Sequence, residues 1–157
     1  MVKAKEIEAG QVAEELFLSG LNCAESALLA LAKMQGSESS VMPGIATCFG
    51  GGMARTGGAC GALTGALMGL GLALGRKKAG DPILVVQEAT QRLIREFEQS
   101  FGARDCHILL GYAPNGPDGN QAFSKEGRRE RCAMMTRKCT EFAARIVLES
   151  QAAKQEN

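Results

Sequence analysis

Apolar residues recur along this chain at intervals of three and four, which is the period of an amphipathic helix. No stretch alternates at every second position, as a half-buried strand would. The first predicted helix carries Val12 to Phe17 and ends at Gly20, the second runs from Asn22 to Gly36, and a short third one opens at Ser39 or Ser40 and is lost by Gly50. A central helix lies within Thr56 to Gly75, with the turn into it at Cys60. Three more are predicted: one from Asp81 to Gly102, a short one from Asp105 to Leu110, and a last one that carries Cys139 and Val147.

Residues at the ends of these segments reinforce the helical pattern. Asn22 is a good N-cap, and Glu25 three positions later completes a capping box. Asp81 followed by Pro82 is a typical helix start, and Gly102 can end the same helix in a left-handed conformation. The sequence therefore predicts an all-α fold.

The segment from Thr56 to Gly75 carries no charge and is rich in glycine. So much glycine makes it a poor membrane span, and we predict instead a helix that is buried on all sides. Glycines at every fourth position form a ridge on which neighbouring helices can pack: Gly57, Gly61, Gly65 and Gly69. Residues 1–157 are thus predicted to form a single domain. It is a bundle of about five main helices around this Gly/Ala/Leu-rich central helix, with a polar tail at 151–157.

Composition and charge exclude several classes of function. Of the 157 residues 45% are apolar, which is enough to bury a core without disulfides or a structural metal. A net charge of +1 and only 4% aromatic residues argue against a nucleic-acid-binding protein. Because His107 is the one histidine, metal sites and catalytic triads that need two histidines are excluded.

The six cysteines are the unusual feature that remains. The first residues mix both charge signs and lack the apolar core of a secretory signal, so we expect a cytoplasmic protein. In that reducing compartment, clustered cysteines are more often redox-active or metal-binding than joined in structural disulfides. Cys23, Cys60 and Cys106 fall at predicted helix starts, where the helix dipole lowers the pKa of a thiol. The alternative is that each is a small buried apolar residue.

Several short motifs make the sequence similar to a known family. The chain resembles the C_GCAxxG_C_C family of redox-active proteins over roughly residues 12–150. The segments that carry the resemblance are Gly20-Leu-Asn-Cys23-Ala-Glu, Phe49-Gly-Gly-Gly-Met53, Cys60-Gly-Ala-Leu-Thr-Gly65, Phe101-Gly-Ala-Arg-Asp-Cys106 and Lys138-Cys139-Thr-Glu-Phe.

This resemblance implies a bacterial or archaeal all-helical protein with a redox or metal function and no defined substrate. It implies that the functional cysteines are Cys23, Cys60, Cys106 and Cys139, with Gly61, Ala62 and Gly65 as the motif backbone. Cys48 and Cys132 lie outside the pattern and could either act as resolving thiols or simply pack against their neighbours. A related helical domain occurs in split-Soret-type cytochromes. However, no cysteine lies three positions before Cys106, so c-type haem attachment is absent here.

We expect packing on the glycine ridge to bring the four cysteines of the pattern together. Four thiolates suit a [2Fe-2S] centre for electron transfer, our first hypothesis, or a tetrahedral zinc site. A thiol-disulfide oxidoreductase, with Cys60 or Cys23 as the attacking thiolate, would need the same convergence. A zinc-stapled or plain helical adaptor is the third alternative. Neither a dinucleotide-binding nor a P-loop motif occurs, although Gly50 to Gly52 could form an anion nest with Arg55.

Basic residues surround the last two cysteines: Lys125, Arg128, Arg129, Arg131, Arg137 and Lys138. They could stabilise thiolates, dock an acidic redox partner or simply form a solvated helix face. The glycine ridge and this basic helix leave surface for a homodimer. His107 is a minor candidate ligand or proton donor.

Overall fold

The computed structural model describes residues 1–125 and 127–155, and over these residues the protein is all-α, as predicted. One isolated antiparallel bridge joins Ala59 to Asp105. The helices, in chain order, are α1 (Val2–Leu18), α2 (Cys23–Gln35), the 3-10 helix η1 (Gly44–Phe49), α3 (Gly61–Leu74), α4 (Leu84–Phe101), α5 (Cys106–Leu110), α6 (Gly119–Ser124) and α7 (Arg128–Gln155).

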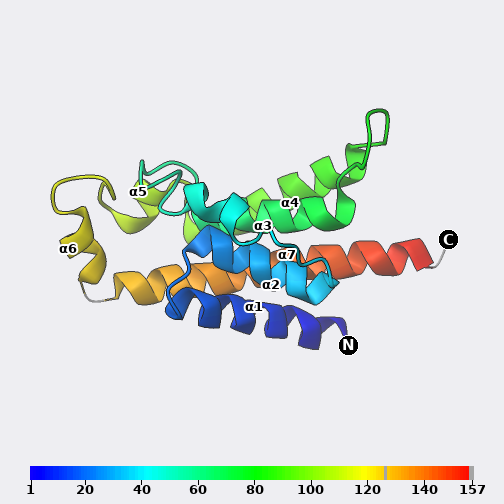
Figure 1. Ribbon diagram of the computed structural model, residues 1–157, viewed down its shortest axis with the longest axis horizontal. Coiled ribbons are helices and arrows are strands. Elements are labelled where there is room, and N and C mark those ends of the chain that lie inside the picture. Colours follow the sequence, from blue (N-terminus) through cyan, green and yellow to red (C-terminus); the bar gives the residue numbers. More distant parts are fainter. Residues whose placement is uncertain (126, 156–157) are drawn as a thin grey trace.

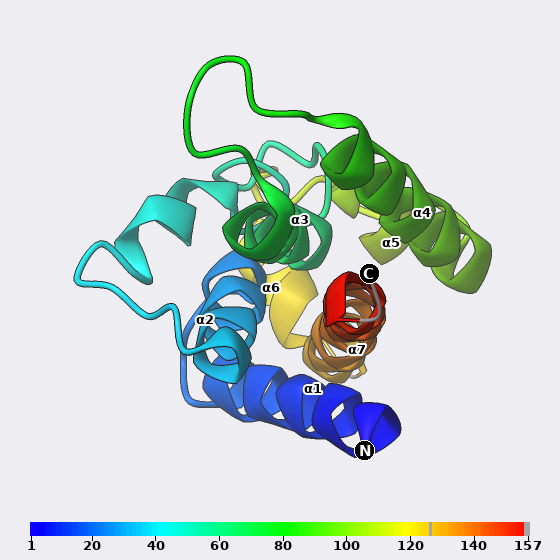
Figure 2. The same cartoon turned by 90° about the vertical axis from the view of Figure 1, so that its right-hand side faces the viewer.

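The five longer helices form a bundle in which α3 and α7 share the central position. Figure 2 shows α1, α2, α3 and α4 arranged around α7, whose right-hand side is open in this view, and α7 contacts each of the four. Helix α3 in turn packs against α2, α7 and α4. The short helices α5 and α6 lie together at one end of the bundle, where α2, α3 and α7 begin (Figure 1). The fold therefore brings three helix starts to the same end of the molecule.

Helix α2 packs closely on the glycine ridge of α3. A Cβ atom added to Gly61 would meet the Cys23 sulfur, one on Gly65 would meet the backbone of Ala24, and one on Gly69 would meet the Leu31 side chain. The predicted role of the ridge in packing is confirmed for these three glycines. No larger residue fits at Gly65 unless the α2 backbone moves.

Helix α3 begins at Gly61 with Cys60 as its N-cap, which confirms the predicted helix start at Cys60, whereas residues 56–60 of the segment predicted to be the central helix are not helical. Gly57 has a φ of 82° and belongs to the preceding turn, so the fourth glycine is not part of the helical ridge. The far end of α3 is also not buried on all sides, since Leu72 is exposed. No helix in the described part of the chain has the length and apolar character needed to cross a membrane.

Two other predicted helix starts are displaced. Helix α4 begins at Leu84 rather than at Asp81, because the Asp81 carboxylate accepts backbone N–H bonds from Lys77 and Lys78 and thus caps the preceding turn. The short helix predicted from Ser39 or Ser40 is a turn followed by η1, which begins only after Pro43. Of the predicted polar tail, residues 151–155 continue α7, and 156–157 lie outside the described residues.

The ridge gives a stability prediction with a matched control on the same helix. Gly65→Ala should lower the free energy of unfolding by about 1–3 kcal/mol, because the new methyl overlaps the backbone of α2. Gly71→Ala should raise it by about 0.5–1 kcal/mol, because that position faces open space and alanine favours helix. Denaturant unfolding monitored by circular dichroism measures both changes. Equal effects of the two variants would contradict the close α2–α3 contact.

Candidate functional site: a cavity lined by cysteines

Cys23 is the first residue of α2, and the predicted capping box fixes its position. Asn22 Oδ1 accepts the N–H groups of Ala24 and Glu25 at 3.0 Å, and Glu25 accepts the Asn22 N–H at 2.8 Å. Glu25 also accepts a hydrogen bond from the Thr47 hydroxyl at 2.6 Å, which ties η1 to the helix start. With its side chain against Gly61, Cys23 lies at the junction of α2 and α3.

The glycine-rich segment after η1 forms a left-handed turn. Gly51 to Arg55 all have positive φ, including the non-glycine residues Met53, Ala54 and Arg55 at 61°, 52° and 67°. Such a conformation costs roughly 1–2 kcal/mol for each non-glycine residue. The turn places the Gly51 N–H against the Cys23 sulfur. Burial is the largest influence on this thiol and raises its pKa, whereas the Gly51 N–H is one of several smaller influences that lower it.

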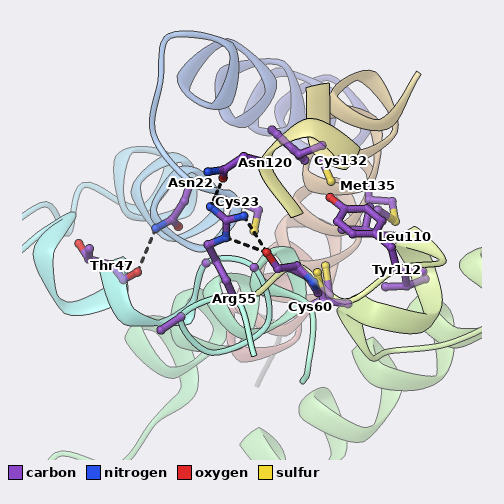
Figure 3. A pocket seen from close by; sticks show the side chains of 17 residues that line it. Asn22, Cys23, Thr47, Arg55, Cys60, Leu110, Tyr112, Asn120, Cys132 and Met135 are labelled. Atoms are coloured by element: carbon purple, nitrogen blue, oxygen red, sulfur yellow. Dashed lines mark hydrogen bonds between the residues drawn. The ribbon is translucent and has the colours of Figure 1, made fainter. Parts of the chain in front are cut away.

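Arg55 ties this turn to the loop that follows α5. Its Nε and Nη2 donate to the Pro114 carbonyl at 3.2 and 2.7 Å, and its Nη1 donates to Asn120 Oδ1 at 2.6 Å (Figure 3). We call this connection the Arg55 strap. It holds together two segments that lie about sixty residues apart in the sequence.

Backbone hydrogen bonds between two loops place Cys60 and Cys106. The Cys60 N–H donates to the Arg104 carbonyl, and the Cys106 N–H donates to the Gly58 carbonyl, each at 2.7 Å. His107 adds a backbone bond to the Gly57 carbonyl at 3.1 Å, and its ring Nδ1 lies 2.7 Å from the same oxygen. His107 is thus engaged by the backbone. The two cysteines are fixed relative to each other by main-chain geometry.

These segments enclose a cavity of about 470 Å³, a volume typical of small-ligand sites. Four cysteines line it, each from a different segment: Cys23, Cys60, Cys106 and Cys132. Most of the remaining wall is apolar, and a few polar side chains stand among it. The other lining residues are Asn22, Thr47, Gly50, Gly51, Ala54, Arg55, Leu109, Leu110, Tyr112, Pro114, Asn120, Phe123 and Met135 (Figure 3).

The two other cysteines lie elsewhere. Cys139 is 0% exposed and packs within the apolar core, so it is not among the described residues that line the cavity. It belongs to the same core cluster as Cys60, which does line the cavity. Cys48 is exposed on η1 and is not among the described residues that line the cavity. All six cysteines are free thiols.

The predicted lowering of thiol pKa values at helix starts is wrong, because burial outweighs the helix ends. Burial raises the pKa of Cys23, although the N–H groups of Gly51, Ala24, Cys23 and Ala62 oppose it. Burial and the charge of Cys23 raise the pKa of Cys60 well above its usual value. At Cys106 and His107 the first N–H groups of α5 are already used by the glycine turn. The cavity thiols are therefore neutral at pH 7.

The thiols on α5 and α7 follow the same rule. Burial and the charge of Cys23 raise the pKa of Cys106 to about 11. Burial and the charges of Cys23 and Cys106 raise the pKa of Cys132 to about 12, and Arg131 lowers it only slightly. Burial also raises the pKa of Cys139. The mutual effects of these thiols show that they form one electrostatic cluster.

The basic residues of α7 are mostly engaged with other partners than the thiols. Arg137 pairs with Glu14 and Glu141, each at 3.0 Å, and Lys138 pairs with Glu141 at 2.8 Å. The Arg128 guanidinium lies 4.5 Å from the centre of the Tyr112 ring. Most of these charges therefore form ion pairs or stack on a ring.

The sulfur atoms surround a space rather than a point. Over residues 1–125 and 127–155, no group of three or more His, Cys, Asp or Glu side chains is placed to hold a metal ion. As placed, the cysteines form the wall of a cavity and not a closed single-ion site.

Comparison with known protein families identifies the family of this chain. The family described as "Putative redox-active protein (C_GCAxxG_C_C)" matches residues 21–146, from the α2 cap to the middle of α7. The chain belongs to this family. No curated protein and no solved structure matches it. Of the four cysteines of the family pattern, Cys23, Cys60 and Cys106 line one cavity, and Cys139 is buried in the core.

Sequence reasoning for this C_GCAxxG_C_C protein missed three residues of the cavity. The family pattern leaves Cys132 out, and nothing in the sequence marks Tyr112 or the hydrogen bonds of the Arg55 strap as part of the site. A signal existed for Cys132, since it lies seven positions before Cys139 and thus on nearly the same helix face. Tyr112 lies in an irregular loop whose path no periodicity predicts.

The raised pKa values predict how the cavity thiols react. At pH 8 only about one Cys106 in a thousand is a thiolate, so alkylation by iodoacetamide should be slow. Its rate should rise about tenfold for each pH unit until the pH approaches about 11. Peptide mapping by mass spectrometry, with exposed Cys48 as the internal reference, measures this. A rate at Cys106 that levels off by pH 9 would be inconsistent with burial of its thiol.

The Arg55 strap predicts a change in access to the cavity. Arg55→Met removes three hydrogen bonds from a charged group, so alkylation of Cys23 and Cys60 should be at least about tenfold faster. Arg76→Met, at an exposed loop position, is the matched control and should leave the rates unchanged. Rates at Cys23 and Cys60 equal to those of the unmodified chain would show that the strap does not close the cavity.

Proposed function

We propose that this protein is an electron-transfer protein whose cavity cysteines hold an iron-sulfur centre, with [2Fe-2S] as the expected form. The observation that carries the proposal is the convergence of cysteines from four separate segments on the wall of one cavity. Membership of a family described as redox-active agrees with it. Cys23, Cys60 and Cys106 are the ligands on which the family pattern and the cavity agree.

The donor set suits such a centre. Iron-sulfur clusters are commonly ligated by four cysteine thiolates, and sulfur is abundant here while imidazole is almost absent. Four sulfurs around a single zinc ion would lie only about 3.8 Å apart, given a Zn–S distance of 2.3 Å. A centre with two irons and bridging sulfides needs ligands spread around a larger space. The cavity offers that space.

Protonation of the thiols also favours a metal centre over thiol-disulfide exchange. An exchange enzyme needs an attacking thiolate near neutral pH, whereas burial raises the pKa of every cavity cysteine. Iron cations would replace the thiol protons and relieve the repulsion between neighbouring thiolates. A thiol-disulfide oxidoreductase and a helical adaptor protein are the alternatives that must be excluded by experiment.

Two further proposals concern the setting of this reaction. Electron transfer requires a donor and an acceptor, so we propose that the protein binds a redox partner protein. We also propose that two copies of the chain form a homodimer. Cytoplasmic location stays a prediction of the sequence.

Anaerobic reconstitution with ferrous iron and sulfide tests the proposal. The protein should bind iron and acid-labile sulfide in equal stoichiometric amounts, become brown and give an electron paramagnetic resonance signal on reduction. Because loading displaces thiol protons, the iron bound at equilibrium should decrease as the pH falls.

A matched pair of variants makes this test specific. Cys60→Ala should abolish iron binding, whereas Cys48→Ala should not, since Cys48 lies outside the cavity. A colourless protein that binds one zinc per chain would support the stapled adaptor. A thiol count that changes in steps of two without bound metal would support the exchange enzyme. Either result would overturn our proposal.

A further inference from the structure

Cys132 lies outside the family's cysteine pattern but on the wall of the cavity. It is part of the first half of α7, is partly exposed and lines the same space as Cys23, Cys60 and Cys106. Figure 3 shows its sulfur directed into the cavity, next to the ring of Tyr112. The Met135 side chain, one turn further along α7, lines the cavity as well. This stretch of α7 thus presents sulfur to the site.

Cys139 occupies a different environment on the same helix. It lies two turns after Cys132, is 0% exposed and belongs to the apolar core formed with residues such as Leu63 and Val147. A ligand must face the group that it binds, and the cavity wall does not include Cys139 among the described residues. Because Cys139 lies two turns further along nearly the same helix face, a move of Cys139 into the cavity would require α7 to shift along its axis.

We propose that Cys132, and not Cys139, supplies the α7 thiolate to the iron-sulfur centre. This inference rests on the function proposed above and deepens it, because it names the fourth ligand. The four-cysteine set is then the one that encloses the cavity: Cys23, Cys60, Cys106 and Cys132. Cys139 instead packs as a buried apolar residue in the core cluster that also contains Cys60.

The wall around Cys132 agrees with this assignment. Tyr112 lines the cavity next to Cys132 (Figure 3), and the Arg128 guanidinium lies 4.5 Å from the centre of its ring. Because Arg128 also belongs to α7, this contact ties the cavity wall to the helix that carries Cys132.

Three alanine variants of the full chain test the assignment: Cys132→Ala, Cys139→Ala and, as the matched control, Cys48→Ala. Each is loaded anaerobically with ferrous iron and sulfide, and iron, sulfide and the electron paramagnetic resonance spectrum of the reduced form are measured. Cys132→Ala should lose bound iron or show a changed spectrum. Cys139→Ala and Cys48→Ala should match the unmodified chain.

Protection of thiols gives a second readout that needs no variant. On loading of the unmodified chain, alkylation of Cys132 by iodoacetamide should slow by at least about tenfold, because a metal-bound thiolate is not free to react. Cys48 should react at the same rate before and after loading.

The outcomes separate the two proposals. If Cys132→Ala binds as much iron and sulfide as the unmodified chain with the same spectrum, Cys132 is not a ligand, and the iron-sulfur function still stands. If Cys132 reacts equally fast in the loaded and unloaded chain, the same conclusion follows even where a variant fails to fold. If the unmodified chain binds no iron, the proposed function fails and the ligand assignment fails with it.

Discussion

The contact between Cys23 and Gly61 is the constraint on which the rest of the site depends. Because Gly61 lacks a side chain, the sulfur at the start of α2 lies directly against the backbone at the start of α3. The Ala62 N–H then acts on the sulfurs of both Cys23 and Cys60, and it lowers the pKa of each against the larger effect of burial. Two residues far apart in sequence thereby share one hydrogen-bond donor.

The remainder of the site is held in place by main-chain contacts that carry a cost. The left-handed residues Met53 to Arg55 are unfavourable on their own, at roughly 1–2 kcal/mol each. Strain of this kind persists only where neighbouring contacts impose it. Here the Arg55 strap and the hydrogen bonds of Cys60 and Cys106 to the facing loop impose it. The neutral thiols avoid the much greater cost of burying several thiolates together.

Much of the scaffold could be predicted from the sequence, because helix period and caps are local signals. The capping box at Asn22 and Glu25 and the ends at Gly36 and Gly102 are as expected. The path of the glycine turn could not be predicted, since several successive left-handed residues depend on partners such as Pro114 that lie far along the chain. The predicted lowering of the thiol pKa values was wrong because burial, which depends on the whole fold, outweighs the helix ends.

The candidate site was predictable in kind but not in membership. The motifs located Cys23, Cys60 and Cys106, and these residues do converge. Cys132 and Cys139 lie on nearly the same face of α7, so which of them lines the cavity depends on how far along the helix the cavity extends, and the burial pattern alone does not fix that. We expect that only sulfur surrounds iron bound in this cavity. X-ray absorption at the iron K-edge of the anaerobically purified protein tests it most directly. We expect a first shell of sulfur alone with a second iron beyond it, and a shell containing oxygen or nitrogen, or no iron at all, would contradict the account.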